Sequence, residues 1–324
     1  MNEPDSAAPA INPDPPTTLA PPTTPAPVSR RGFAMGLVAV SSVVISFGGL
    51  VIRAMEDADA LQINFYRSLA LVTAIMTILI FQHRGNTIAH VRKIGRAGLL
   101  GGFLLGAAGI CFLQSLTHTT VANTLFTLSA IPFITAALAW LVLGERLRRA
   151  TLVTMVGAAA GIFVMMAEGV GAGSAYGNAM ALVTACGFSG FAVIVRRYRG
   201  IDMLPTLLVS GAFIAAVSLI ARWDDLGISL HDLLLCILWG GVLSGIANWL
   251  FIVASRHLVA AEVTLFMLLE FALGPLWVWL FIGETPTGWT LAGGVTVIAA
   301  VAIRAAFELK RGQPPLKRGR PSPV

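Results

Sequence analysis

The chain has 324 residues, of which 56% are hydrophobic and only 12% are charged, and its mean hydropathy is +0.81. A soluble domain of this length needs about a quarter of its residues charged to cover its surface with polar groups. The composition therefore excludes a protein whose whole surface faces water. The net charge of +6 does not indicate a nucleic-acid partner, because the basic residues lie in alternate loops of a membrane protein.

Both ends of the chain differ in composition from its centre. Residues 1–32 are rich in proline and threonine and cannot bury enough apolar surface to fold. Residues 307–324 are basic and also contain prolines. We expect both tails to be disordered and to lie in the cytoplasm.

Between the tails, the chain contains a series of apolar runs. A helix needs about 20 apolar residues to cross the roughly 30 Å hydrocarbon layer of a bilayer. Ten runs meet this length, with approximate ranges 33–52, 61–81, 97–116, 121–143, 151–167, 176–195, 203–221, 233–254, 261–282 and 288–306. The sequence therefore predicts an all-α integral membrane protein with ten transmembrane helices, and the lipid bilayer is its first expected partner.

The basic residues indicate how these spans are oriented, because Lys and Arg accumulate in cytoplasmic loops. With a cytoplasmic N-terminus, 19 of the 22 basic residues fall on the inner side, two fall on the outer side and Arg67 falls within a span. The outer loops carry mostly acidic residues. This asymmetry predicts a multi-pass protein of a bacterial inner (plasma) membrane, with both termini in the cytoplasm.

An internal repeat relates the two halves of the chain. Residues 106–152 align without gaps with residues 245–291, at a constant offset of 139 (245 minus 106). The most informative matches are Trp140-Leu141 with Trp279-Leu280 and Gly144-Glu145 with Gly283-Glu284. Because each half holds five spans, an odd number, the two copies must have opposite orientations. We predict two inverted five-helix repeats, residues 33–167 and 176–306, with a substrate site between them near the midplane.

Two ionisable residues stand out inside the predicted spans, where charges are costly and are commonly functional. Glu270, about nine residues into the ninth span, is a candidate for binding a substrate amine or for taking up a proton. Its alternative role is that of a protonated acid hydrogen-bonded to a neighbouring helix. Arg67, near the outer end of the second span, could bind an anionic group. It could instead reach the lipid headgroups or pair with Glu56, Asp57 or Asp59.

Uncharged polar or amphipathic side chains complete the candidate site. They are Asn64, Gln114, Asn248 and Trp249. Each could line a cavity, or could instead form hydrogen bonds between helices. Pro132 and Pro275 predict helix breaks near such a cavity. The three cysteines show no CxxC spacing and no histidine pairs with another ligand at metal-binding spacing, so we expect no metal and no cofactor.

Three stretches of the chain form a recognisable pattern. They are Phe65-Tyr66-Arg67, the run from Thr120 to Leu147 with Ile131-Pro132 and Gly144-Glu145, and its second copy from Ala261 to Glu284 with Leu269-Glu270. This pattern resembles EamA-type members of the drug/metabolite transporter (DMT) superfamily, and it covers about residues 33–306. The family commonly has proline after the glutamate of the ninth span, where this chain has Phe271. The resemblance implies a transporter that exports amino acids or similar small metabolites, and an uptake carrier for a vitamin or nucleoside-like compound is the alternative.

Other functions have less support in the sequence. No GxxxxGK(S/T) loop is present, so we do not expect ATP to drive transport from within this chain. We do not expect an enzyme, because the sequence shows no HExxH motif, no serine nucleophile with a matching histidine and no facing aspartate pair. A channel is a further alternative function, whereas the internal repeat disfavours a receptor. We expect secondary transport of a small molecule by alternating access, with protons as a candidate coupling ion and a homodimer as a candidate assembly.

Overall fold

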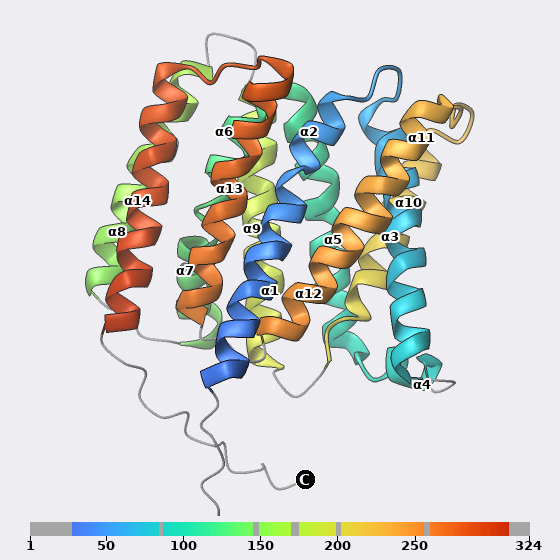
Figure 1. Ribbon diagram of the computed structural model, residues 1–324, viewed down its shortest axis with the longest axis horizontal. Helices are drawn as coiled ribbons and strands as arrows, with labels where there is room; N and C mark the ends of the chain where they lie inside the picture. Colours follow the sequence, from blue (N-terminus) through green and yellow to red (C-terminus); the bar gives the residue numbers. More distant parts are fainter. Residues whose placement is uncertain are drawn as a thin grey trace, which may run out of the picture.

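Helices form every element in the part of the chain that the structure, a computed structural model, describes (Figure 1). These residues are 28–83, 87–144, 149–169, 175–198, 202–255 and 260–310. The tails predicted at 1–32 and 307–324 lie largely outside the described residues, except that residues 28–32 and 307–310 belong to helices.

The described residues of the first half form eight helices. They are α1 (Val28–Ser46), α2 (Gly48–Arg53), α3 (Ala60–His83), α4 (Thr87–Arg92), α5 (Gly95–His118), α6 (Val121–Leu128), α7 (Ile131–Leu143) and α8 (Arg149–Gly169). Those of the second half form α9 (Ala175–Arg197), α10 (Thr206–Ala221), α11 (Leu230–Ile237), the π-helix η1 (Leu238–Ser244), α12 (Gly245–Ser255), α13 (Ala260–Ile282) and α14 (Gly288–Lys310).

Seven helical segments of the described chain are long and apolar enough to cross a membrane. They are Gly32–Arg53, Ala60–Gln82, Gly95–His118, Val121–Leu143, Ala175–Arg197, Leu230–Leu250 and Gly288–Phe307. Three shorter apolar helices cover Leu152–Met165, Thr206–Ala221 and Phe266–Ile282. Each of the ten predicted ranges therefore overlaps an apolar helix, although only seven of these helices are long enough to count as candidate spans.

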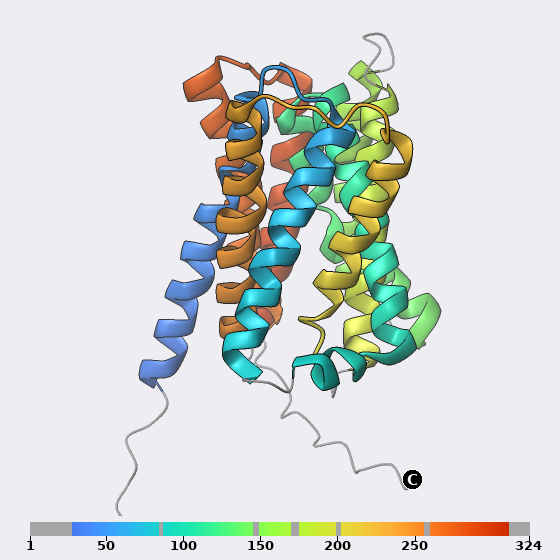
Figure 2. The same cartoon turned by 90° about the vertical axis from the view of Figure 1, so that its right-hand side faces the viewer.

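The helices lie side by side in one bundle (Figures 1 and 2). We call the end at which α1 begins and α14 ends the terminal end, and the opposite end, with the α2–α3 and α13–α14 links, the distal end. Large apolar side chains are exposed around the bundle, among them Phe81, Phe163 and Ile220, which are 78%, 73% and 77% exposed. Such a surface is unfavourable in water and suits the acyl chains of lipids.

Helices of the first half pack mainly on helices of the second half. α1 packs on α12 and α13, and α9 packs on α5, α6 and α7. α3 packs on η1 and α10, α5 also packs on α10, and α6–α13 and α8–α14 are further pairs. α8 and α14 approach each other closely at Gly161 and Gly293, where the carbonyl oxygen of each glycine lies too close to allow a Cβ on the other.

Three of the apolar segments are interrupted. α1 and α2 are separated at Phe47, α6 and α7 are separated at Ser129 and Ala130, and η1 replaces regular α-helix within the Leu230–Leu250 segment. The second interruption directly precedes Pro132, which lies in the first turn of α7. Proline is well tolerated there, because its missing N–H would have no partner within the helix.

Pro275 does not interrupt its helix. α13 runs from Ala260 to Ile282 with Pro275 inside it, so the structure has no helix break at this proline, in contrast to the prediction. Proline removes a single N–H donor, and neighbouring groups in a packed membrane helix compensate for that loss. α13 ends instead at Gly283 (φ 80°), as α7 ends at Gly144 (φ 67°), because glycine adopts this left-handed conformation without the steric cost of a Cβ.

Candidate substrate-binding site

The helix that carries Arg67 begins at a side-chain cap. Asp59 Oδ1 accepts hydrogen bonds from the backbone N–H groups of Leu61 (2.8 Å) and Gln62 (2.9 Å), and the Asp59 carboxylate also pairs with Arg222. These bonds satisfy donors that the first turn of a helix leaves free. Arg67 lies two turns further along α3, about 10 Å from the helix start at 1.5 Å per residue.

Arg67 contacts an amide on its own helix and an aromatic ring on another. Its guanidinium lies 4.7 Å from the centroid of the Trp239 ring, and its Nη2 donates a hydrogen bond to Asn64 Oδ1 at 3.3 Å. A cation over an indole face is attracted by the negative charge density of the ring. Asn64 and Arg67, both predicted as site residues, therefore belong to one cluster, and Trp239 is its third member.

The π-helix η1 brings Trp239 to this position. A π-turn is wider than an α-turn and is found frequently at functional sites. Gly240 packs against the backbone carbonyl of Arg67 so closely that the carbonyl oxygen already occupies the place of a Cβ. Sequence analysis misses Trp239, and the Gly240-Gly241 pair after it is the signal that two helices come close at this point.

Two N–H donors of the cluster have no acceptor among the described residues. Asn64 is fully buried and its Nδ2 makes no hydrogen bond, and the buried Nε of Arg67 makes none either. No carboxylate within the described ranges pairs with Arg67. An unsatisfied buried donor destabilises a folded protein by about 1–3 kcal/mol, and more for a charged group. Such a cost is typical of a binding site, because a purely structural cluster would satisfy its donors.

The interruption in the first apolar segment lies beside the cluster. A Cβ on Gly48 would lie 2.7 Å from Trp239 Nε1, so the contact needs glycine. On the other side, Phe47 stacks on Trp277 of α13 with ring centroids 5.0 Å apart, and Trp277 Nε1 donates to Ser46 Oγ at 2.9 Å. The interruption is therefore held between two tryptophans from different helices of the second half.

Glu270 lies on α13, two turns before Trp277 and closer to the terminal end. Its side chain is half-buried and makes no hydrogen bond or ion pair with any side chain that the structure describes. Glu270 makes no ion pair or hydrogen bond with Arg67 either. Glu270 and Arg67 are thus two separate ionisable groups of the bundle, each without an ion-pair partner in the described residues.

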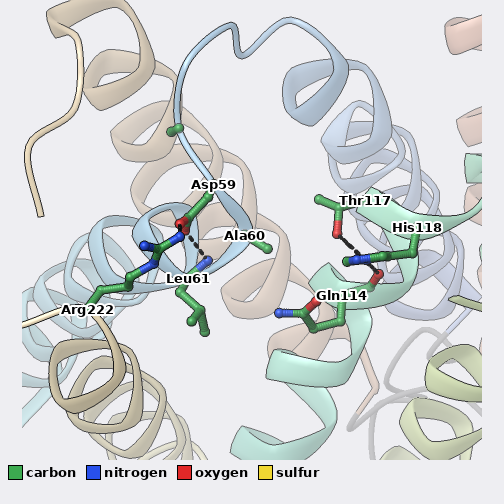
Figure 3. A pocket seen from close by; sticks show the side chains of 8 residues that line it. Asp59, Ala60, Leu61, Gln114, Thr117, His118 and Arg222 are labelled. Atoms are coloured by element: carbon green, nitrogen blue, oxygen red, sulfur yellow. Dashed lines mark hydrogen bonds and ion pairs between the residues drawn. The ribbon is translucent and has the colours of Figure 1, made fainter. Parts of the chain in front are cut away.

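A depression of about 350 Å³ opens between α3 and α5 toward the distal end (Figure 3). Gln114, a predicted site residue, lines it together with His118, whose Nδ1 lies 2.9 Å from the carbonyl oxygen of Gln114. Arg67 lies deeper between the same two helices, since a Cβ on Gly109 of α5 would be 4.0 Å from its Nη2. The Arg67 cluster therefore lies below this depression.

Asn248 and Trp249 lie apart from the cluster, on α12. Asn248 Nδ2 donates to the carbonyl oxygen of Ser244 in its own segment at 2.7 Å, and Trp249 is 40% exposed on the outside of the bundle. The structure therefore brings Asn64 and Arg67 together but joins neither of them to these two residues.

Two carboxylates join neighbouring elements at the distal end. Glu284 Oε2 pairs with Arg53 Nε of α2 at 2.6 Å, and its Oε1 accepts the backbone N–H of Val121, the first residue of α6, at 2.8 Å. Asp232 of α11 is fully buried, and its carboxylate accepts the backbone N–H groups of residues 56, 57 and 58 at 3.1, 3.0 and 2.9 Å. These contacts fasten the α2–α3 link to α11 and the end of α13 to α6.

The sequence profile of the EamA-like transporter family matches residues 32–167. These residues are similar to an EamA domain. This match confirms the resemblance to the DMT superfamily. Together with the apolar helices, this match supports a multi-pass membrane transporter.

Similarity to known proteins extends past residue 167. The chain is similar to a protein named pseudopaline exporter CntI in two strains of Pseudomonas aeruginosa, each 28% identical over 275 residues that cover 81% of this chain and 91% of the relative. Among solved structures, one crystal structure has a TM-score of 0.63 at 15% identity and covers 87% of this chain and 98% of that chain. The fold is therefore shared over most of both chains.

Proposed function

We propose that this EamA transporter is a secondary carrier that exports a small organic metabolite, an amino acid or a related compound, by alternating access. The observation that carries the proposal is Arg67, an arginine without a carboxylate partner in the described residues, placed beside two interrupted helical segments. Unpaired charges and interrupted helices at membrane depth are typical of substrate sites in transporters. Similarity to a named exporter favours outward transport.

We also propose that the ten apolar segments are transmembrane helices in two inverted repeats, residues 33–167 and 176–306. The two repeats would relate each span to the span five positions away in the chain. Under this relation, the α1–α12 pair corresponds to the α9–α5 pair, and the α3–η1 pair corresponds to the α10–α5 pair. Three further pairs each join equivalent spans of the two repeats: α3–α10, α6–α13 and α8–α14. This pairing supports a pseudo-two-fold axis in the membrane plane, with the site at the interface of the repeats.

Residues matched by the internal repeat support the same arrangement. Gly144 and Gly283 both end a helix with positive φ, and Trp140 and Trp279 are 51% and 50% exposed. α7 lies toward the terminal end, whereas the α13–α14 link lies at the distal end (Figure 1). Exposed tryptophans near both ends of a bundle suit the two interfaces of a bilayer.

We propose further that the terminal end faces the cytoplasm and that the membrane is a bacterial inner membrane. Basic residues gather at the terminal end after α3 and α9, and the distal loops carry Asp57, Asp224 and Asp225. Cysteine labelling in a cysteine-free background tests this topology. With a membrane-impermeant maleimide, Asp224→Cys should react in intact cells and Tyr198→Cys should react only after lysis, and the reverse pattern would contradict the orientation.

Counterflow in proteoliposomes tests the transport function. Vesicles that contain the purified protein are loaded with an unlabelled compound, and uptake of the same labelled compound is followed for pseudopaline and for each of the twenty amino acids. We expect saturable uptake of at least one compound, stimulated by the internal substrate. Unsaturable uptake would instead indicate a channel, and uptake equal to that of protein-free vesicles for every compound would contradict the proposed cargo class.

A further inference from the structure

We infer that the cluster of Asn64, Arg67 and Trp239 binds the carboxylate group of the transported metabolite. The inference rests on the proposed transport function for its biological role. The binding itself, however, can be measured in the absence of transport.

The first argument is the charge of the cluster. Other arginines near the bundle have oxygen acceptors: Arg53 binds Glu284 and the carbonyl oxygen of Thr119, Arg222 pairs with Asp59, and Arg304 donates to the carbonyl oxygen of Pro132. Arg67 has only a neutral amide oxygen, 3.3 Å away, and no carboxylate among the described residues. The residue as a whole is half-buried, and its Nε is fully buried. An anion would therefore supply the charge that this part of the bundle lacks.

The second argument is the arrangement of donors. The Cζ of Arg67 lies over the Trp239 ring, so we place the ligand at the edge of the guanidinium. On that edge Nη2 is held by Asn64 Oδ1, whereas Nε has no acceptor in the described part of the chain, and the Nδ2 of Asn64 has none either. A flat guanidinium edge matches the two oxygens of a carboxylate. One amide and one guanidinium satisfy a planar, singly charged group better than a phosphate, which has more oxygens and more charge.

The third argument is the rigidity and accessibility of the site. Gly240 against the Arg67 carbonyl and Gly48 against Trp239 leave no room for a larger residue, so three helices meet at a fixed distance around the cluster. The depression lined by Gln114 lies above the cluster between α3 and α5. On this inference, a small carboxylate enters through the depression and reaches Arg67 between these two helices.

The test measures the melting temperature of the full-length protein in detergent at constant ionic strength. Acetate is the probe, and acetamide, which has nearly the same shape but no charge, is its control. We expect a saturable rise in Tm with acetate and none with acetamide, because a ligand that binds only the folded state stabilises it. In Arg67→Gln, loss of a charge-assisted hydrogen bond should weaken acetate binding by about tenfold or more.

Asn64→Asp provides a second test that does not depend on removing the arginine. It changes few atoms and places a carboxylate within hydrogen-bonding distance of Arg67, so we expect a higher Tm without probe and no response to acetate. Arg304→Gln is the matched control, because Arg304 also lies over an aromatic ring, that of Phe133 at 5.7 Å, but has a backbone acceptor. This variant should keep the acetate response.

The possible results separate the binding site from the transport function. An absent acetate response in the unmodified protein overturns the inference, as does a response that persists in both Arg67→Gln and Asn64→Asp. A larger response to inorganic phosphate than to acetate overturns the assignment to a carboxylate. If acetate still raises Tm but no compound shows counterflow, the proposed export is contradicted and the carboxylate site is not.

Discussion

Glu284 caps a helix that begins 163 residues earlier, because its Oε1 accepts the backbone N–H of Val121 at 2.8 Å. The same carboxylate pairs with Arg53 of α2, which also donates to the carbonyl oxygen of Thr119 at 2.9 Å. Arg53 and Glu284 are 24% and 21% exposed, so solvent screens the pair only partly. One side chain therefore joins α2, α6 and the end of α13 at the distal end.

Glu284→Ala should lower the free energy of unfolding by about 1–3 kcal/mol, through loss of the cap and of the ion pair. Unfolding in detergent, followed by circular dichroism, measures the change. Arg222→Gln is the comparison, because its ion pair with Asp59 is more exposed, at 41% and 33%, and should contribute only about 0–1 kcal/mol. Equal losses in the two variants would contradict a structural role of the Glu284 cap.

Two adjacent glycines of η1 provide a sharp test of the close contact at Arg67. A Cβ on Gly240 would overlap the Arg67 carbonyl oxygen, whereas a Cβ on Gly241 would lie 3.7 Å from the nearest atom, the carbonyl oxygen of Ala70. Gly240→Ala should therefore destabilise the protein by about 1–3 kcal/mol through overpacking. Gly241→Ala should be neutral or slightly stabilising. Thermal unfolding of both variants gives the comparison, and similar Tm values would show that η1 is not packed as described.

The apolar segments could be predicted from the sequence because their composition alone decides where helices can form. Arg67 and Asn64 could be found for the same reason, since polar groups are conspicuous in an apolar run. Trp239 could not be found, because one more tryptophan in an apolar run carries no signal until η1 turns it toward Arg67. The helix break expected at Pro275 is absent. A proline breaks one helix but is accommodated in another, depending on whether neighbouring groups compensate for its missing N–H, and the sequence alone does not show those neighbours.

Asn123 is the centre of a buried polar network near the distal end. Its Nδ2 donates to Asn178 Oδ1 and its Oδ1 accepts from Thr290 Oγ1, both at 3.1 Å. Asn123→Leu should lower the free energy of unfolding by about 1–3 kcal/mol, because its partners lose hydrogen bonds in a buried place. Thr296→Val is the control, since the Thr296 hydroxyl is exposed and donates to the carbonyl oxygen of Ala292 in its own helix. A loss confined to Asn123→Leu would support the network, and a neutral effect would contradict it.

Glu270 is proposed to take up and release a proton during transport. Its half-buried carboxyl group makes no ion pair among the described side chains, so the proton can come and go without breaking a structural contact. Glu270→Gln cannot titrate and should abolish transport or make it independent of pH, while the protein still inserts and folds. Counterflow at a series of pH values, with size-exclusion chromatography as the check of folding, measures both effects. Unchanged pH-dependent flux in this variant would exclude Glu270 from coupling.

Asp232 connects the two helices between which Arg67 and Trp239 meet. Its carboxylate holds the link that leads into α3, and Asp232 itself belongs to α11, which continues into η1. We therefore expect α3 and η1 to move as one rigid body when the bundle changes state, with the Arg67–Trp239 contact preserved. A site that stays assembled in this way binds its anion with the same affinity whichever side is open. We then expect the gradients across the membrane, rather than a difference in affinity at this site, to drive the proposed export.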